Sequence, residues 1–176
     1  MKRLFYVVAL AGSIHATSLL AQHGVIREYA ALAPKLNAAL NGFDGEAWKI
    51  VPTDGQRVGY EGVTLVKIGS WYVLTAAEWN GGGNRSDGTY DMMYSCAKNL
   101  LGPYKSRRVA VPHAGHGALF PDKAGRWNAG LFGNDRTAPF RAMPGFVPVE
   151  ARDTGDDLLI RPAQDDPPAA RSSRNF

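Results

Sequence analysis

The chain has 176 residues, of which 45% are hydrophobic and 20% are charged. These proportions are ordinary for a globular protein, so they exclude disorder throughout the chain and leave room for one domain of ordinary size. The net charge of +4 comes from arginines scattered along the sequence, not from the clustered basic stripe of a nucleic-acid surface, so no nucleic-acid partner is predicted. Cys96 is the only cysteine, which excludes an internal disulfide and predicts a buried reduced thiol.

Residues 1–21 have the pattern of a secretory signal peptide. A basic start is followed by the short apolar run Leu4–Gly12, and small residues suited to cleavage follow at Ala16 and Ala21. The run is shorter than the roughly 20 residues that a membrane-spanning helix needs, so no membrane partner is predicted. The prediction is a secreted or periplasmic protein. The alternative that stays open is that Leu4–Leu10 forms a buried strand of the fold.

Residues 22–57 are predicted to be a linker, an irregular segment or a partial sheet unit. Alanine and leucine recur at loosely helical spacing over residues 25–41, but Pro34 interrupts them. A short helix and a meandering linker are therefore both open for this stretch. At the other end of the chain, residues 163–176 are rich in proline, serine and charge, which predicts a disordered tail.

Residues 58–162 are typical of short strands joined by tight turns. The expected strands are Val63–Ile68, Trp71–Trp79, Thr89–Ala97, His116–Phe120, Arg126–Phe132, Phe146–Glu150 and Asp157–Ile160. A flexible glycine-rich loop is expected between the second and third strands. The two return strands that carry tryptophan lie about 55 residues apart, and each follows a turn that contains glycine. A repeat of that length, with one small antiparallel sheet per unit, favours the blades of a β-propeller.

Three segments of this region resemble the later blades of glycoside hydrolase family 43: GYEGVTLVKIGSWYVLTAAEW at 59–79, YDMMYSCAKNLLGPY at 90–104 and VPHAGHGALFPDKAGRW at 111–127. Members of that family are five-bladed β-propellers that cleave arabinose- or xylose-containing glycans. The resemblance implies an all-β chain with about three antiparallel blades of a five-bladed propeller over residues 58–162. It also implies a plant-type polysaccharide or oligosaccharide as the partner.

The resemblance implies a role for two residues. The general acid of the family is a glutamate in a Tyr-Glu-Gly context, which Glu61 matches in Gly59-Tyr60-Glu61-Gly62. The Gly-His-Gly motif of the family places a histidine near the propeller axis, where it helps to hold a metal ion or water. His116 matches that histidine, so Ca²⁺ or another ion is expected near it, although no cofactor is required.

The residues themselves support Glu61 as a catalytic acid. Glycoside hydrolysis needs a carboxylic acid that protonates the leaving oxygen and a second carboxylate across the sugar. A glutamate at the start of a strand, flanked by glycine, can lie at a propeller mouth with its backbone close to a ligand. Tyr60 beside it can stack on a sugar. The alternative is that Glu61 is a solvated edge residue that discourages strand pairing.

Other residues are predicted to bind substrate, in addition to Tyr60 and His116. Glu78 and Trp79 precede the glycine loop and Arg85 lies within it, where they can contact sugar hydroxyls. Solvation at the surface is the alternative for such polar residues, and for His116 the alternative is a satisfied core histidine.

Further residues near these motifs have weaker predicted roles. His113 lies three residues before His116 and can join it at an ion, although a His-x-x-His pair is weak evidence for a metal. Asp91 is a candidate for a sugar contact. Asn134 and Asp135 are predicted to cap a turn.

The other carboxylates of the family's catalytic set have no match. In the family a general-base aspartate and a second aspartate that orients the acid precede the glutamate, in the first two blades. Here only Asp44 and Asp54 lie upstream, and neither has the family's Asp-Pro context. Loss of a general base typically costs about 10²–10⁴-fold in rate. The function predicted is therefore a fragment or truncated form of an arabinose- or xylose-directed glycoside hydrolase, inactive alone, with half of an assembly completed by a second chain as an open alternative. The alternatives are a non-catalytic carbohydrate-binding partial propeller and a truncation without function.

Overall fold

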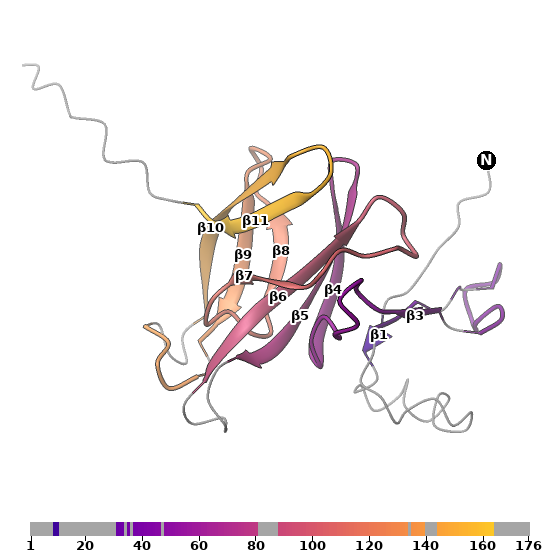
Figure 1. The fold of residues 1–176 in the computed structure, drawn as a ribbon, viewed down its shortest axis with the longest axis horizontal. Helices are drawn as coiled ribbons and strands as arrows, with labels where there is room; N and C mark the ends of the chain where they lie inside the picture. The colour runs from indigo at the N-terminus through magenta and orange to yellow at the C-terminus, as the bar shows by residue number, and fades with distance from the viewer. Residues whose placement is uncertain are drawn as a thin grey trace, which may run out of the picture.

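The computed structural model describes residues 9–10, 31–33, 35, 37–46, 48–80, 88–133, 135–139 and 144–163. All regular structure within these ranges is β-strand, which confirms the all-β prediction. No helix in this part of the chain is long and apolar enough to cross a membrane. The strands form one three-stranded and two four-stranded sheets, and every pairing between consecutive strands is antiparallel (Figure 1).

Each four-stranded sheet is a meander in chain order, which is the unit of a propeller blade. The first consists of β4 (Glu61–Ile68), β5 (Trp71–Asn80), β6 (Thr89–Ala97) and β7 (Arg108–Val111). The second consists of β8 (Ala118–Pro121), β9 (Trp127–Phe132), β10 (Pro144–Asp153) and β11 (Leu158–Pro162). The three-stranded sheet contains β1 (Ala9–Leu10), β2 (Ala31–Ala33) and β3 (Trp48–Ile50).

The β4–β5 hairpin shows how the sequence fixes the first blade. Ile68 pairs with Trp71 across a two-residue turn, and Gly69 takes a φ of 57°, which a side chain would disfavour. Near its start, β4 has a register shift between Glu61 and Thr64, because the strand carries one more residue than its partner. Such a bulge bends a strand and re-aims its side chains. It lies where β4 presents Glu61.

The core lies between the two four-stranded sheets. Trp71, Val73, Met92 and Tyr94 face residues of the β8–β11 sheet such as Leu119, Leu131, Leu158 and Ile160. The other face of the β4–β7 sheet is also covered, because Leu74, Ala76 and Met93 pack with Ile50, Val58 and Tyr104. The β4–β7 sheet is therefore the middle layer, between the β8–β11 sheet and the N-terminal strands (Figure 1).

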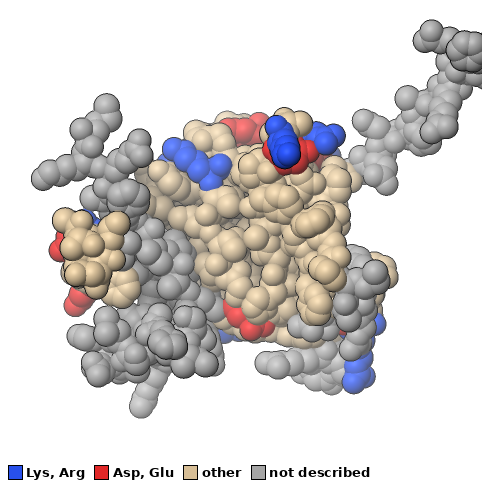
Figure 2. All heavy atoms as spheres, turned by 180° about the vertical axis from the view of Figure 1, so that it is seen from behind, with Lys and Arg blue, Asp and Glu red and all other residues tan. Residues whose placement is uncertain are grey.

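Charged side chains are unevenly distributed over the surface. Seen from behind, the middle of the molecule is a broad uncharged surface, and Lys, Arg, Asp and Glu gather at its upper and lower margins (Figure 2). The charges on this face do not form the clustered basic stripe that is typical of a surface that binds nucleic acid.

The N-terminal region differs in part from its prediction. The helical alternative for residues 25–41 is wrong for Ala31–Ala33, which form β2 and pair with Trp48–Ile50. Pro34 interrupts a helix at this point. Pairing with β3 instead provides hydrogen-bond partners for the backbone N–H and C=O groups of β2. Ala9–Leu10 pair with Ala31–Leu32, so these two residues of the predicted signal peptide form a strand here. The remaining residues of the predicted signal peptide and nearly all of the predicted tail lie outside the described residues, so both stay predictions.

Candidate functional site

The candidate site lies at one end of the β4–β7 sheet, where β4 and β6 begin and β5 ends. Glu61 opens β4, and its side chain is 42% exposed. Across the sheet the register pairs Trp79 of β5 with Tyr90 of β6. Tyr90 is fully buried, with 0% of its surface exposed. The site thus combines a carboxylate open to solvent with an aromatic floor that belongs to the core.

Tyr90 connects the two residues that the family resemblance singles out. Its hydroxyl donates a hydrogen bond to Oε1 of Glu61 and lies 3.1 Å from Nδ1 of His116. The distance between His116 Nδ1 and Glu61 Oε1 is 3.8 Å. The His116 side chain is 52% exposed, so the pair lies at the surface while the phenol between them is anchored below. The predicted acid and the predicted axial histidine are therefore brought together by a residue that the sequence did not single out.

Glycines allow the close approach of the strands around this pair. A Cβ at Gly62 would lie 3.2 Å from Cα of His116, and Gly62 has a φ of 62°. A Cβ at Gly115 would lie 2.1 Å from the ring of Tyr90, and one at Gly117 would lie 2.1 Å from the carbonyl oxygen of Gly130. His116 itself takes a φ of 64°, a left-handed conformation that is uncommon for a histidine. The Gly-His-Gly motif is thus required by packing, which fixes where His116 can lie.

Aromatic rings line one side of the site. The rings of Trp79 and Tyr90 are tilted against each other with centroids 4.9 Å apart, and Tyr60 lies 6.5 Å from Tyr90. The guanidinium of Arg57 lies over the Tyr60 ring at 5.4 Å. Trp79 is only partly buried. Partly exposed aromatic rings beside a carboxylate offer the flat apolar surface on which a sugar ring stacks.

The buried carboxylate of Asp135, in the turn after β9, contacts both β6 and the loop before β8. Asp135 is 1% exposed, and its carboxylate accepts hydrogen bonds from the Tyr90 amide at 3.0 Å and from the Thr137 amide at 3.0 Å. His113 Nδ1 lies 3.0 Å from the same group. Desolvation raises the pKa of Asp135, but these hydrogen bonds and the His113 ring outweigh it and leave the pKa below its usual value. The predicted turn-capping role of Asp135 is confirmed, and this residue also fixes Tyr90.

Asp91 has a structural role on the other face of the sheet. Its Oδ1 accepts a hydrogen bond from the His113 amide at 2.8 Å, and its Oδ2 accepts from Asn80 at 2.9 Å and from Thr89 at 2.9 Å. Asp91 is 4% exposed. Consecutive strand residues point to opposite faces, so Asp91 points away from the side of Tyr90 and Trp79. Its carboxylate joins β6 to the loop that carries His113.

Glu78 is placed away from Glu61. It pairs with Asp91 in the register, and its carboxylate lies 3.1 Å from Nε of Arg57 and 3.1 Å from an Nη of Arg107. Only 7% of Glu78 is exposed. Two arginines on one nearly buried carboxylate make this group a link between the loop before β4 and the segment before β7. Arg85 and Asn134 fall outside the described residues.

The described protein groups around His116 do not by themselves complete a calcium site. Calcium takes six to eight oxygen ligands, water among them. Within the described residues, the His116 imidazole lies next to the phenol of Tyr90 and the carboxylate of Glu61. No group of three or more His, Cys, Asp and Glu side chains suited to a metal occurs in the described ranges. An ion bound through His116 stays a prediction, and no step of the chemistry below depends on it.

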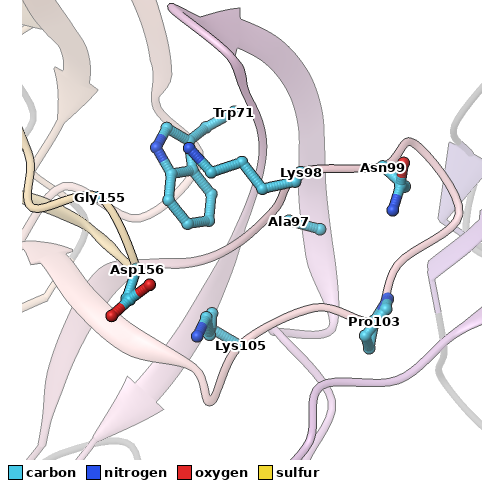
Figure 3. Close-up of a pocket in the computed structure, with 8 residues that line it drawn as sticks. All are labelled: Trp71, Ala97, Lys98, Asn99, Pro103, Lys105, Gly155 and Asp156. Atoms are coloured by element: carbon cyan, nitrogen blue, oxygen red, sulfur yellow. The ribbon is translucent and has the colours of Figure 1, made fainter.

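A pocket of about 330 Å³ lies at the opposite end of the same sheet, where β5 begins and β6 ends. Figure 3 shows Lys98 extended along the indole of Trp71, with Lys105 and Asp156 on the facing side. The Lys98 ammonium is 3.7 Å from the centroid of the Trp71 ring. The strand length of β5 separates this pocket from Glu61, so it is not part of the candidate site.

Solved structures of glycan-degrading proteins share this arrangement of strands. The chain is similar to the bifunctional GH43-CE protein of Bacteroides eggerthii, with a TM-score of 0.55 and 24% identity over 76% of this chain and 18% of that one. It is also similar to an exo-1,5-α-L-arabinanase from a bovine ruminal metagenomic library, with a TM-score of 0.54 and 15% identity over 77% of this chain and 50% of that one. For the Cellvibrio cellulosa α-L-arabinanase complexed with arabinohexaose, the TM-score is 0.52 and the identity is 16%, over 74% of this chain and 49% of that one.

The fold is a family 43-like partial β-propeller. This confirms the predicted fold class, and it is the fold alone that these identities show. No family model matches the chain, and no curated protein is similar enough to match it. The chain spans from 18% to 50% of the length of these three solved structures, so the similarity does not assign their activities to it.

Proposed function

We propose that this chain is the acid-bearing part of a glycoside hydrolase that acts on arabinose- or xylose-containing glycans, with Glu61 as the general acid. The observation that carries the proposal is the contact between Glu61, the Tyr90 hydroxyl and His116 at one end of a family 43-like sheet. The similarity to an arabinanase that was solved in complex with arabinohexaose supports a carbohydrate as the partner.

In this proposal the carboxyl proton of Glu61 passes to the glycosidic oxygen as the bond to the sugar breaks. Tyr90 fixes the carboxyl group, so that the proton is presented from one direction, and Trp79 and Tyr60 offer the sugar an apolar wall. Positioning of this kind contributes because it removes the entropy cost of orienting the acid in the transition state. The exposed side of Glu61 leaves its carboxyl group open to the substrate.

Hydrolysis also needs a second carboxylate, either as a base that activates water or as a nucleophile. The described carboxylates of Asp91, Asp135 and Glu78 are held by protein groups. Asp91 and Asp135 accept several hydrogen bonds each, and Glu78 pairs with two arginines. We therefore propose that the chain alone has little or no turnover and that a second chain completes the propeller. Secretion or export to the periplasm belongs to the same proposal, because polymeric plant glycans lie outside the cell.

The second candidate function is carbohydrate binding without cleavage. The observation that favours it is the lack of an unengaged second carboxylate beside Glu61 in the described residues, while the aromatic wall of Trp79 and Tyr60 is in place. In this case Glu61 and His116 donate and accept hydrogen bonds to sugar hydroxyls, and Arg85 adds a contact from the loop after β5. Affinity then depends on the rings more than on Glu61.

Turnover and binding measured on the same samples separate these functions. The purified chain and its Glu61→Gln variant are assayed on aryl arabinofuranosides and xylosides, and arabinohexaose and xylohexaose are titrated by NMR. We expect hexaose binding by both proteins and turnover by neither. The variant Glu150→Gln is the matched control, because Glu150 pairs with Arg161 on the outer strands of the other blade.

The possible results decide between the proposals. Turnover by the wild-type chain that Glu61→Gln abolishes would contradict inactivity but keep Glu61 as the acid. Equal turnover by both proteins would remove Glu61 from that role. Binding of neither hexaose at millimolar concentration would contradict both the hydrolase and the binding function.

A further inference from the structure

The cavity of about 330 Å³ at the end of the β4–β7 sheet opposite to Glu61 has no part in the chemistry proposed above. Trp71, which lines the cavity, and Ala77, which pairs with Glu61, are six residues apart in β5. At about 3.4 Å per strand residue, this separation is roughly 20 Å. One sugar unit cannot contact both places, so the cavity is a site of its own.

The walls of the cavity come from three parts of the chain (Figure 3). Most of them belong to the connection between β6 and β7, which faces the turn between β10 and β11. The main lining residues are Trp71 of β5, then Lys98, Asn99, Pro103 and Lys105 of the connection, and Asp156 of the turn. The cavity therefore lies where the ends of the two four-stranded sheets meet.

Hydrogen bonds fix both facing walls. In the connection, the hydroxyl of the buried residue Tyr104 donates to the Leu100 carbonyl at 2.8 Å. In the turn, the Gly155 amide donates to Oδ1 of Asp153 at 2.8 Å. Walls that the protein itself holds in place are typical of small-molecule sites, which are usually formed before the ligand arrives.

Lys98 covers the indole at the side of the cavity. Its ammonium donates to Oγ of Ser70 at 2.8 Å and lies 3.7 Å from the centroid of the Trp71 ring. It also lies 3.7 Å from a carboxylate oxygen of Asp153, which offsets its charge. Trp71 is 1% exposed, so a ligand meets the methylene groups of Lys98 instead of the ring.

Three further polar side chains at the cavity, those of Asn99, Lys105 and Asp156, make no hydrogen bond or ion pair with any described residue. They supply an amide, an ammonium and a carboxylate, and thus both donors and acceptors. The charges of Lys105 and Asp156 are opposite, and Asp153 offsets Lys98. A ligand of either charge would meet a group of like sign, whereas a neutral ligand with several hydroxyl groups would not.

We propose that this cavity is a second carbohydrate site, which binds a neutral sugar unit of a glycan. Hydroxyl groups of the sugar donate to the Asp156 carboxylate and accept from the Lys105 ammonium and the Asn99 amide. The C–H groups of the sugar pack on Pro103 and on the methylene groups of Lys98. Small-ligand sites have volumes of about 300–1,000 Å³, so this cavity suits one or two sugar units and not a long segment.

The inference rests on the proposed function in one respect, which is the choice of arabinose and xylose as the sugars. Binding in the cavity does not require Glu61. A polymer held there stays attached while the Glu61 site is empty, which raises the local concentration of sugar units at that site. The cavity would thus act as an anchor for the glycan.

A site-resolved NMR titration of the full chain tests the proposal. Arabinose, xylose, the two hexaoses and inorganic phosphate are added separately to the isotope-labelled protein. The amides of Lys105 and Gly155 report on the cavity, and those of Gly62 and His116 report on the Glu61 site. We expect saturable shifts at the cavity with arabinose or xylose at millimolar concentrations, and binding of phosphate that is at least about tenfold weaker.

Two variants change the cavity from opposite walls. Lys105→Ala and Asp156→Ala should each weaken sugar binding at the cavity about tenfold, because each removes a charged partner of a hydroxyl group. Asp156→Ala should strengthen the binding of phosphate, since a like charge is removed. Lys123→Ala is the matched control for Lys105→Ala, because Lys123 is exposed on the turn between β8 and β9. The same spectra show that each variant is folded.

The outcomes separate the cavity from the Glu61 site. The absence of saturable shifts at the cavity with every sugar, or sugar binding there that neither variant weakens, would overturn the inference. Phosphate binding tighter than that of any sugar would replace it with an anion site. Sugar binding at the cavity without binding at the Glu61 site would support the inference and contradict the proposed function. The reverse result would overturn the inference and leave the proposed function standing.

Discussion

The phenol of Tyr90 is fully buried, yet its hydroxyl donates a hydrogen bond to the half-exposed carboxylate of Glu61. Tyr90 is fixed from below, since its amide donates to Asp135 and its carbonyl accepts from the Gly115 amide at 2.8 Å. The core of the blade therefore determines where the carboxyl group points. Four expectations follow from contacts of this kind.

Replacing Tyr90 with phenylalanine should separate positioning from packing. The ring still packs on Trp79, but the hydroxyl that joins Glu61 to His116 is lost. We expect a loss of about 1 kcal/mol in the free energy of unfolding and a weakening of hexaose binding, measured by urea unfolding and NMR titration. Tyr94→Phe is the control, because the Tyr94 hydroxyl makes comparable bonds to Leu158 and Ile160 inside the core. Equal loss of binding in both variants would contradict a positioning role for Tyr90.

A methyl group at Gly115 should be poorly tolerated. The new Cβ would lie 2.1 Å from Cδ1 of Tyr90, whose ring is buried and has no room to move away. Overpacking of this kind typically costs about 1–3 kcal/mol, so thermal unfolding of Gly115→Ala should begin well below that of the wild-type chain. Gly145→Ala is the control, because its nearest neighbour would be the Leu131 side chain at 3.4 Å. A Gly115→Ala protein as stable as the control would contradict this packing.

The ion pair between Arg108 and Asp157 should make the free energy of unfolding depend on pH in the acidic range. Arg108 donates to both carboxylate oxygens of Asp157, at 2.7 and 2.8 Å, and these bonds hold the pKa of Asp157 below its usual value. Because the folded pKa is lower than the unfolded pKa of about 3.9, the stabilisation is complete above that value. It is lost as the pH falls through the folded pKa.

Urea unfolding of Asp157→Asn at several pH values between 6 and 2.5, in steps of about half a unit, checks this expectation. The variant should be less stable than the wild-type chain at pH 6 and should lose less stability on acidification. Asp156→Asn, at the exposed neighbouring position, should follow the wild-type curve. Parallel curves for Asp157→Asn and the wild-type chain would show that this ion pair does not contribute to the acid response.

Cys96 should be inert in the folded protein. Its thiol is 0% exposed, and burial raises its pKa, with a smaller contribution in the same direction from Asp157. Reactive thiolates are exposed and have a lowered pKa, so Cys96 lacks both requirements. A disulfide reagent at pH 8 should label less than a tenth of the thiol in an hour under native conditions and all of it in urea. Rapid native labelling would place Cys96 at the surface.

Strand periodicity in the sequence predicted most of the two blades. The predicted strand Thr89–Ala97 is β6 with the same bounds, and Trp71–Trp79 is β5 without its last residue. These strands are long, rich in β-branched and aromatic residues, and bounded by glycine. The strand β7 (Arg108–Val111) was missed, because it has only four residues, begins with an arginine and follows a polar stretch, and it forms only by pairing with β6.

The family resemblance in the sequence located Glu61 and His116, whereas the connection between them depends on the fold. The register between β5 and β6 cannot be read from the sequence across the long loop that joins them. The sequence therefore does not predict that Tyr90 pairs with Trp79. The same holds for the contact between His113 and Asp135, which lie on different loops. Contacts of this kind depend on register and on sheet-to-sheet packing, which a local pattern does not encode.

Glu61 illustrates which features the sequence determines and which depend on the tertiary structure. The sequence by itself determined that the chain is all-β, that it is built of glycine-bounded hairpins, and that Glu61 begins a strand next to glycine, because these follow from local propensity and residue spacing. Only the tertiary structure decided that Glu61 meets His116 through a buried phenol, that Glu78 pairs with two arginines, and that one sheet leaves Phe132 and Phe146 exposed. Each of these depends on groups that are far apart in the chain and that only the packing of sheets brings within a few ångströms.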